Sequence, residues 1–292
     1  MNTQHYKFTF FLFVSLFAVI FTACQDEVDI DLDDPEQLLV VEGQISDIDS
    51  VQWVKLSYTT DYFDDNEPNY TVEQNALVVL YQNDIVLDTM DFNTATNQFE
   101  WNGQGAAGNT YNIYIRTEDG TEYESFDEIL TTVSPIDSLY YDYESVFLDF
   151  EGYQVKIKTY EPAPEGDYYQ WKVYVNGQYL NTAEDLSISS DENVLDGELD
   201  FSAYFMPQED YDDFSADNTT DVFVRVEQIK ITKTNFEYLN ILADQASGGG
   251  FIFSSPPAQI RGNIVEKGTD TYAVGFFQAV SIDDATVQLF PE

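Results

Sequence analysis

Residues 111–117 read Tyr-Asn-Ile-Tyr-Ile-Arg-Thr, and this stretch decides the fold class. Because side chains of a β-strand alternate between two faces, Tyr111, Ile113 and Ile115 share one face and the polar residues share the other. Asp119-Gly120 is a turn signal, and a second short run follows at 121–126. Short alternating runs separated by turn residues predict an all-β protein.

The same pattern extends toward the N-terminus. Further strands are expected at 38–46, 53–59, 76–81, 85–90 and 99–101. Seven short strands in this space predict an immunoglobulin-like β-sandwich over residues 37–133. Gly108-Asn109-Thr110 before Tyr111 resembles a tyrosine corner, in which a buried hydroxyl bonds to backbone a few residues upstream. The alternative is a simple core tyrosine.

A second antiparallel β domain is expected over residues 134–292, after the break at Ser134-Pro135. Its strands are predicted at 139–146, 153–160, 169–175, 178–180, 199–206, 221–231, 273–281 and 286–290. Asn176-Gly177 is a hairpin signal. The acidic remainder of 181–221 is predicted to form surface loops.

One short helix interrupts the strands. Thr234 and Glu237 fit a capping box, in which each side chain satisfies the other residue's backbone N–H. Phe236, Leu239 and Leu242 then recur at helical spacing and predict a face packed on the core. Gly248-Gly249-Gly250 is expected to end the helix.

The N-terminus carries a targeting signal. Residues 1–23 contain Lys7 followed by the apolar run 8–21, which is too short to span a bilayer as a helix. Thr22-Ala23-Cys24 then resembles a bacterial lipobox, so we expect cleavage before Cys24 and lipidation of Cys24. The alternative is an ordinary signal peptide with a chance cysteine. Acyl chains would anchor the mature protein to a lipid bilayer.

Composition excludes several classes of function. The chain has 54 acidic and 11 basic residues and a net charge of −43, so nucleic-acid binding is not expected. Its only histidine is His5 and its only cysteine is Cys24, so a cleaved and lipidated chain lacks imidazole and free thiol. Carboxylate pairs arise by chance among so many acids. We therefore expect no enzymatic activity, no catalytic residues and no cofactor other than calcium.

Calcium needs only oxygen ligands, which the acidic clusters could supply. Two clusters are candidates, and neither has the spacing of an EF-hand. They comprise Asp61, Asp64, Asp65 and Glu67, and Asp210, Asp212 and Asp213. The alternative interpretation is a pair of solvated acidic loops. Tyrosine-rich runs at 140–143 and 168–171 suggest a carbohydrate platform, although half of each run is expected to be core.

Several segments together resemble an uncharacterised family of outer-membrane lipoproteins of Bacteroidota, the domain of unknown function 4249. The quoted segments are 39–45, 108–115, 135–137, Tyr238-Leu239, Pro256-Pro257, 261–264 and 275–277, behind the lipobox and the acidic tether at 24–36. Acids directly after the lipidated cysteine resemble the surface-export signal of such lipoproteins. The alternative is a solvated tether that faces the periplasm.

The resemblance implies a function next to a transporter. Members of that family are typically encoded beside SusC-like TonB-dependent transporters. An accessory or ligand-capture subunit of such a transporter, lipid-anchored at the outer membrane and facing the cell surface, is therefore expected. The alternative is a stand-alone carbohydrate-binding or adhesive lipoprotein. No ligand-binding residue can be named from the sequence.

Overall fold

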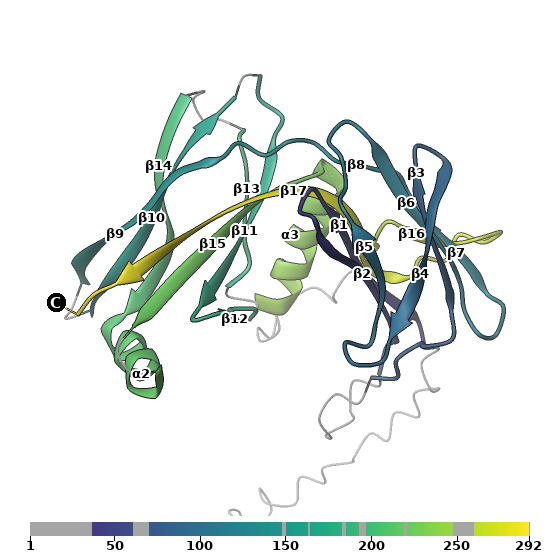
Figure 1. The fold of residues 1–292 in the computed structure, drawn as a ribbon, viewed down its shortest axis with the longest axis horizontal. Coiled ribbons are helices and arrows are strands. Elements are labelled where there is room, and N and C mark those ends of the chain that lie inside the picture. The colour runs from purple at the N-terminus through teal and green to yellow at the C-terminus, as the bar shows by residue number, and fades with distance from the viewer. Residues whose placement is uncertain are drawn as a thin grey trace, which may run out of the picture. The chain divides into compact units, whose positions relative to one another are not determined.

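The computed structural model describes residues 37–60, 70–147, 150–162, 164–182, 185–192, 197–218, 221–247 and 260–291 (Figure 1). These residues are mostly β-strands, with two helices, so the predicted all-β class is confirmed. None of the helices in this part of the chain is long and apolar enough to cross a membrane. Residues 1–36, with Cys24 and the tether, lie outside the described residues, as do Asp61, Asp64, Asp65 and Glu67.

The first region is a β-sandwich. Its strands are hydrogen-bonded to one another in the order β1 (Leu39–Ser46), β2 (Ser50–Tyr58), β5 (Gln98–Gly103), β4 (Ile85–Asn93), β3 (Leu77–Gln82), β6 (Thr110–Arg116), β7 (Glu122–Ser125) and β16 (Ile264–Glu266). Strand β8 (Glu128–Ile129) also pairs with β6. The Tyr111 hydroxyl accepts the Ala106 N–H at 2.8 Å, and Tyr111 is buried. This contact confirms the tyrosine corner.

Alternate side chains of these strands fill one core, called the first core. It contains Leu39, Val41, Ile45, Val54, Leu56, Val78, Leu80, Met90, Phe99, Tyr111, Ile113, Ile115, Leu130, Ile264, Ala273, Phe277 and Ala279. The last four residues come from the C-terminal part of the chain. They complete a core whose other members all precede residue 131.

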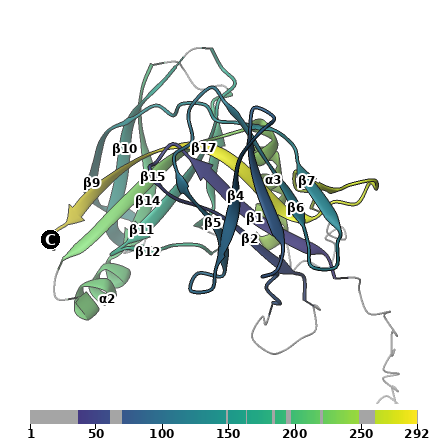
Figure 2. The same cartoon turned by 45° about the vertical axis from the view of Figure 1, so that its right-hand side comes forward.

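Strand β17 (Val274–Leu289) joins the two regions (Figure 2). Its first half pairs in parallel with β1 from Val274 to Val280, and its second half pairs antiparallel with β15 (Val222–Ile231). The predicted break into strands at 273–281 and 286–290 was wrong. The intervening acids do not form a turn, because the Asp283 carboxylate accepts the Ile136 N–H at 2.7 Å while its backbone stays in the sheet.

In the second region, two sheets enclose a second core. One consists of β9 (Ile136–Phe147), β10 (Phe150–Glu161) and β14 (Gly197–Pro207), and the other continues from β17 and β15 to β11 (Tyr168–Val175), β12 (Gln178–Tyr179) and β13 (Ser187–Ser190). The second core contains Val133, Tyr153, Val155, Ile157, Tyr169, Trp171, Val173, Val175, Met206, Tyr211, Val222, Val224, Val226 and Leu289.

Residues 181–221 hold more structure than the predicted loops. Besides β13 and β14 they form helix α2 (Gln208–Asn218), whose Tyr211 is buried in the second core with its ring 4.6 Å from that of Tyr153. Phe214 packs against the same core. Two apolar contacts on an otherwise acidic helix give too weak a periodicity to detect in the sequence.

The predicted helix is α3 (Lys233–Ser247), but its predicted cap was wrong. The Thr232 hydroxyl accepts the Asn235 N–H at 3.3 Å, and the Thr232 carbonyl accepts the Phe236 N–H at 3.0 Å. Thr232 is therefore the N-cap, and Thr234 lies exposed within the first turn. Phe236 and Leu239 pack on the sheet as expected, whereas Leu242 is exposed. The glycine run after α3 lies outside the described residues.

Candidate functional site

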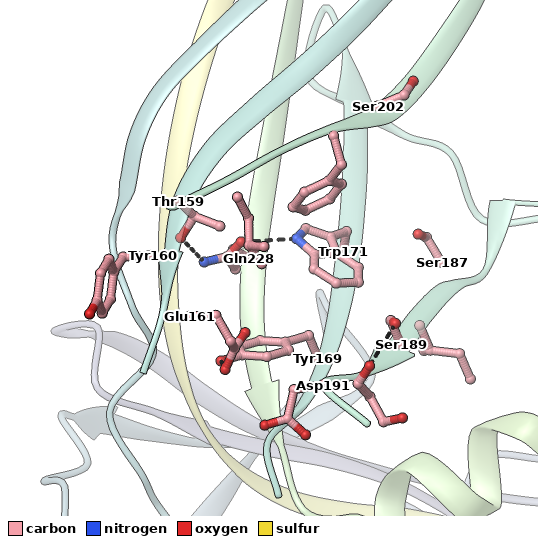
Figure 3. Close-up of a pocket in the computed structure, with 14 residues that line it drawn as sticks. Thr159, Tyr160, Glu161, Tyr169, Trp171, Ser187, Ser189, Asp191, Ser202 and Gln228 are labelled. Carbon is pink, nitrogen blue, oxygen red and sulfur yellow. Dashed lines mark hydrogen bonds between the residues drawn. The ribbon is translucent and has the colours of Figure 1, made fainter. Parts of the chain in front are cut away.

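A cavity of about 370 Å³ lies in the second region, between β10 and β14 on one side and β11, β13 and β15 on the other (Figure 3). Small-ligand pockets typically measure 300–1,000 Å³, so this one suits a compact ligand. Its principal side chains are those of Glu161, Tyr169, Trp171, Asp191, Phe201 and Gln228. They come from the ends or faces of four strands and from the residue that follows β13.

Three aromatic rings form one wall of the cavity. Tyr169 and Trp171 are two positions apart on β11, so both point toward the second core, and their rings stack with centroids 5.8 Å apart. Phe201 of β14 meets the Trp171 ring edge-on at 5.3 Å. The faces of these rings are apolar, which suits a ring or a cation.

Buried Gln228 holds this wall in place. Its Oε1 accepts the Trp171 indole N–H at 3.1 Å, and its Nε2 donates to the Ser134 carbonyl at 2.9 Å and to the Thr159 hydroxyl at 3.1 Å. Thr159 in turn donates to the carbonyl of Pro135. Gln228 is 2% exposed, and these bonds satisfy both ends of its amide.

Three carboxylates meet at the end of the cavity below Tyr169. Oxygens of Glu161, Asp167 and Asp191 lie within 4.8 Å of one another. The Tyr169 hydroxyl donates to Glu161 at 3.0 Å. Lys230 pairs with Asp167 at 2.7 Å, so one ammonium faces three acids.

The loop between β10 and β11 and the end of β13 position these acids. The Gly166 N–H donates to both carboxylate oxygens of Asp191, at 2.9 and 2.8 Å. Burial raises the pKa of Glu161, while the hydrogen bond from Tyr169 opposes that rise. The pKa of the Tyr169 hydroxyl is also raised, first by burial and then by the charges of Glu161 and Asp167.

The predicted calcium residues that the structure describes lie away from this cavity. Asp210, Asp212 and Asp213 lie on helix α2, where Asp212 accepts a hydrogen bond from the Gln208 amide at 2.9 Å. Within the described part of the chain, Glu161, Asp167 and Asp191 are the only group of three or more acids that meets at ligand distance, so the α2 acids do not converge. Calcium binding by the acids of 61–67 and of α2 stays a prediction.

The tyrosine-rich runs divide between core and surface. Tyr141 and Tyr143 place their rings 5.6 and 5.1 Å from Tyr153, and Tyr140 donates to Asp200 at 2.6 Å on the outer face. The sequence pointed to the aromatic part of the cavity through Tyr169 and Trp171. It gave no signal for Glu161, Asp167 or Asp191, because nothing in the sequence distinguishes these three among 54 acids. It gave no signal for Gln228 either.

One protein-family model covers both regions of the chain. The model of a domain of unknown function, DUF4249, matches residues 25–286. The chain belongs to the DUF4249 family. No curated protein matches the chain. The DUF4249 match contains every residue of the cavity and nearly all of β17, so the site lies within the part that the family shares.

Proposed function

We propose that this protein is an outer-membrane lipoprotein, exposed at the cell surface, that captures a ligand as an accessory subunit of a TonB-dependent transporter. The acyl chains on Cys24 would hold it in the membrane plane. The acidic tether would let the β-strand body reach the transporter. The proposal assigns the protein a binding role and no catalytic step.

The observation that carries the proposal is the position of Cys24. The only cysteine of the chain stands where an apolar signal segment ends and an acidic tether begins. Membership of the DUF4249 family is consistent with it, since the match begins at residue 25, directly after this cysteine. The aromatic-lined cavity of the second region supports ligand capture, because its volume suits a small molecule.

Affinity purification of the tagged chain from outer membranes in mild detergent tests the proposal. We expect a TonB-dependent transporter to co-purify with the wild-type chain. Cys24→Ser is the matched control, because it removes only the thiol, and it should leave the protein unanchored and without the transporter. Recovery of a membrane-anchored chain with no transporter would contradict the accessory role.

The second candidate is a stand-alone carbohydrate-binding or adhesive lipoprotein. The stacked rings of Tyr169 and Trp171 favour it, because sugar faces pack on such surfaces. It predicts binding on a glycan array that Trp171→Ala abolishes. Tyr70→Ala is the control, since Tyr70 is exposed and does not line the cavity. An array without binding would remove this candidate.

A further inference from the structure

The hydrogen-bond donors of the cavity wall are already engaged within the protein. The Trp171 indole N–H and the Gln228 amide bond to each other and to neighbouring groups, and the Tyr169 hydroxyl donates to Glu161. The lining serines and Tyr160 carry hydroxyls, which accept as readily as they donate. The cavity therefore offers a ligand mainly acceptors and aromatic faces.

Glu161 is buried and forms no ion pair of its own. It is 3% exposed, and its Oε1 accepts the Tyr169 hydroxyl. Ionised carboxylates can accept about four hydrogen bonds. Among the described residues no lysine or arginine forms an ion pair with Glu161. The Lys230 ammonium is paired with Asp167 and acts on Glu161 only from a distance, partly offsetting the rise in the pKa of Glu161. Figure 3 shows the Glu161 carboxylate turned toward Tyr169 and Asp191.

The charge balance of the lining is negative. Glu161 and Asp191 line the cavity, and none of the described side chains that line it is a lysine or an arginine. A buried carboxylate whose charge no ion pair neutralises costs free energy, whereas a ligand that brings a positive charge offsets this cost. Such a charge would also lie beside the rings of Tyr169 and Trp171, which attract cations.

We propose that this cavity binds an organic cation, with an ammonium or guanidinium nitrogen at Glu161 and Asp191 and an apolar or ring-shaped body against Trp171 and Phe201. The inference rests on the ligand-capture function proposed above and names the chemistry of its ligand. Anionic ligands are excluded by the two carboxylates. A neutral sugar would bring no charge to offset that of the two carboxylates.

A bare metal ion fits the site less well. Calcium takes six to eight oxygen ligands. Here the Lys230 ammonium already binds Asp167, and one backbone N–H bonds to both oxygens of Asp191. A ligand nitrogen with its own N–H groups can instead bond to the free acceptor sites of Glu161 without displacing either contact.

Calorimetry on the full chain in mild detergent tests the proposal with four probes: benzylamine, benzyl alcohol, benzoate and calcium chloride. At neutral pH benzylamine carries the cation and the ring, benzyl alcohol the ring alone, and benzoate the opposite charge. We expect benzylamine to bind with a Kd of about 1 mM, and benzyl alcohol about tenfold more weakly or not at all. Benzoate should not bind.

Three variants locate the binding. Glu161→Gln should weaken benzylamine binding about tenfold, because it keeps the shape but removes the charge. Glu198→Gln is the matched control on the exposed face of β14 and should leave binding unchanged. Ser189→Lys should abolish binding by placing an ammonium at the cavity. Since Ser189 is exposed, this variant should fold even if Glu161→Gln does not.

The outcomes separate this inference from the proposed function. Benzyl alcohol or benzoate binding as tightly as benzylamine would overturn the cation site. It would also be overturned if calcium bound, Glu161→Gln removed the calcium binding, and benzylamine did not bind. Absence of benzylamine binding alongside transporter co-purification overturns the cation site alone. Loss of the transporter with benzylamine binding intact overturns the accessory role alone.

Discussion

The first and second cores of this protein differ in what fills them. The first core is mostly aliphatic. The second is rich in tyrosine, tryptophan and phenylalanine and also buries Thr159, Glu161, Asp191 and Gln228. A cavity lies beside these rings. We therefore expect substitutions in the first core to affect stability most, and substitutions beside the cavity to affect the proposed ligand binding.

The largest effect is expected in the first core. Phe277 is fully buried on β17, so Phe277→Ala should lower the free energy of unfolding by about 4 kcal/mol. Phe223→Ala is the control, because Phe223 is 42% exposed on the neighbouring strand β15 and should change stability little. Urea denaturation measures both. Equal losses would mean that the first core does not dominate stability.

The second-largest effect is expected from Glu128, a buried carboxylate of the first region. Burial raises the pKa of Glu128 from 4.5 to about 7, although Thr232 and Asn263 donate to it. The folded state therefore holds this proton more tightly than the unfolded state. The resulting stability is complete below pH 4.5 and is lost as the pH rises through about 7. The loss should amount to about 3 kcal/mol.

Glu128→Gln should remove this pH dependence. Comparison of urea midpoints of variant and wild type from pH 4 to 8 isolates the contribution of Glu128, because all other groups are shared. Identical slopes would contradict the raised pKa. The same change at Glu161 should alter ligand binding more than stability, since that carboxylate faces a cavity.

A smaller effect is expected at the aromatic wall of the second region. Trp171→Phe removes the indole N–H that bonds to Gln228 and leaves a buried acceptor unpaired, at a cost of about 1.5 kcal/mol. Trp101→Phe is the matched change beside the first core and should be milder, since Trp101 packs against apolar groups. Thermal unfolding followed by circular dichroism compares the two. A smaller loss of stability for Trp171→Phe than for Trp101→Phe would show that the bond between Trp171 and Gln228 does not stabilise the fold.

The smallest effect concerns α3, which covers the outer face of the sheet of the second region. Thr232→Ala removes the N-cap, at a cost of about 1 kcal/mol, together with the hydrogen bond to Glu128. Thr234→Ala should change stability by a few tenths of a kcal/mol at most. Denaturant midpoints distinguish the two variants. If Thr234→Ala lowered stability more than Thr232→Ala, the capping box predicted at Thr234 would be correct.

Local pattern accounts for much of the fold. Alternation predicted the bounds of most strands to within a few residues, and the tyrosine corner at Tyr111 was predicted correctly. These features depend on neighbours in sequence, so a single chain reveals them. Helix α2 was missed because only Tyr211 and Phe214 mark its buried side. The Thr232 cap was missed because Thr234 offered a similar pattern two residues later.

By itself the sequence determined the all-β class, most strand positions and the expectation of a lipid anchor at Cys24. Only the tertiary structure decided that β17 is one strand shared by two regions, and that Glu161, Asp191 and Gln228 meet around a cavity. The physical reason is that alternation is a local property of the backbone. Sheet pairing depends instead on segments far apart in the chain, and this pairing decides which of the 54 acids line the cavity.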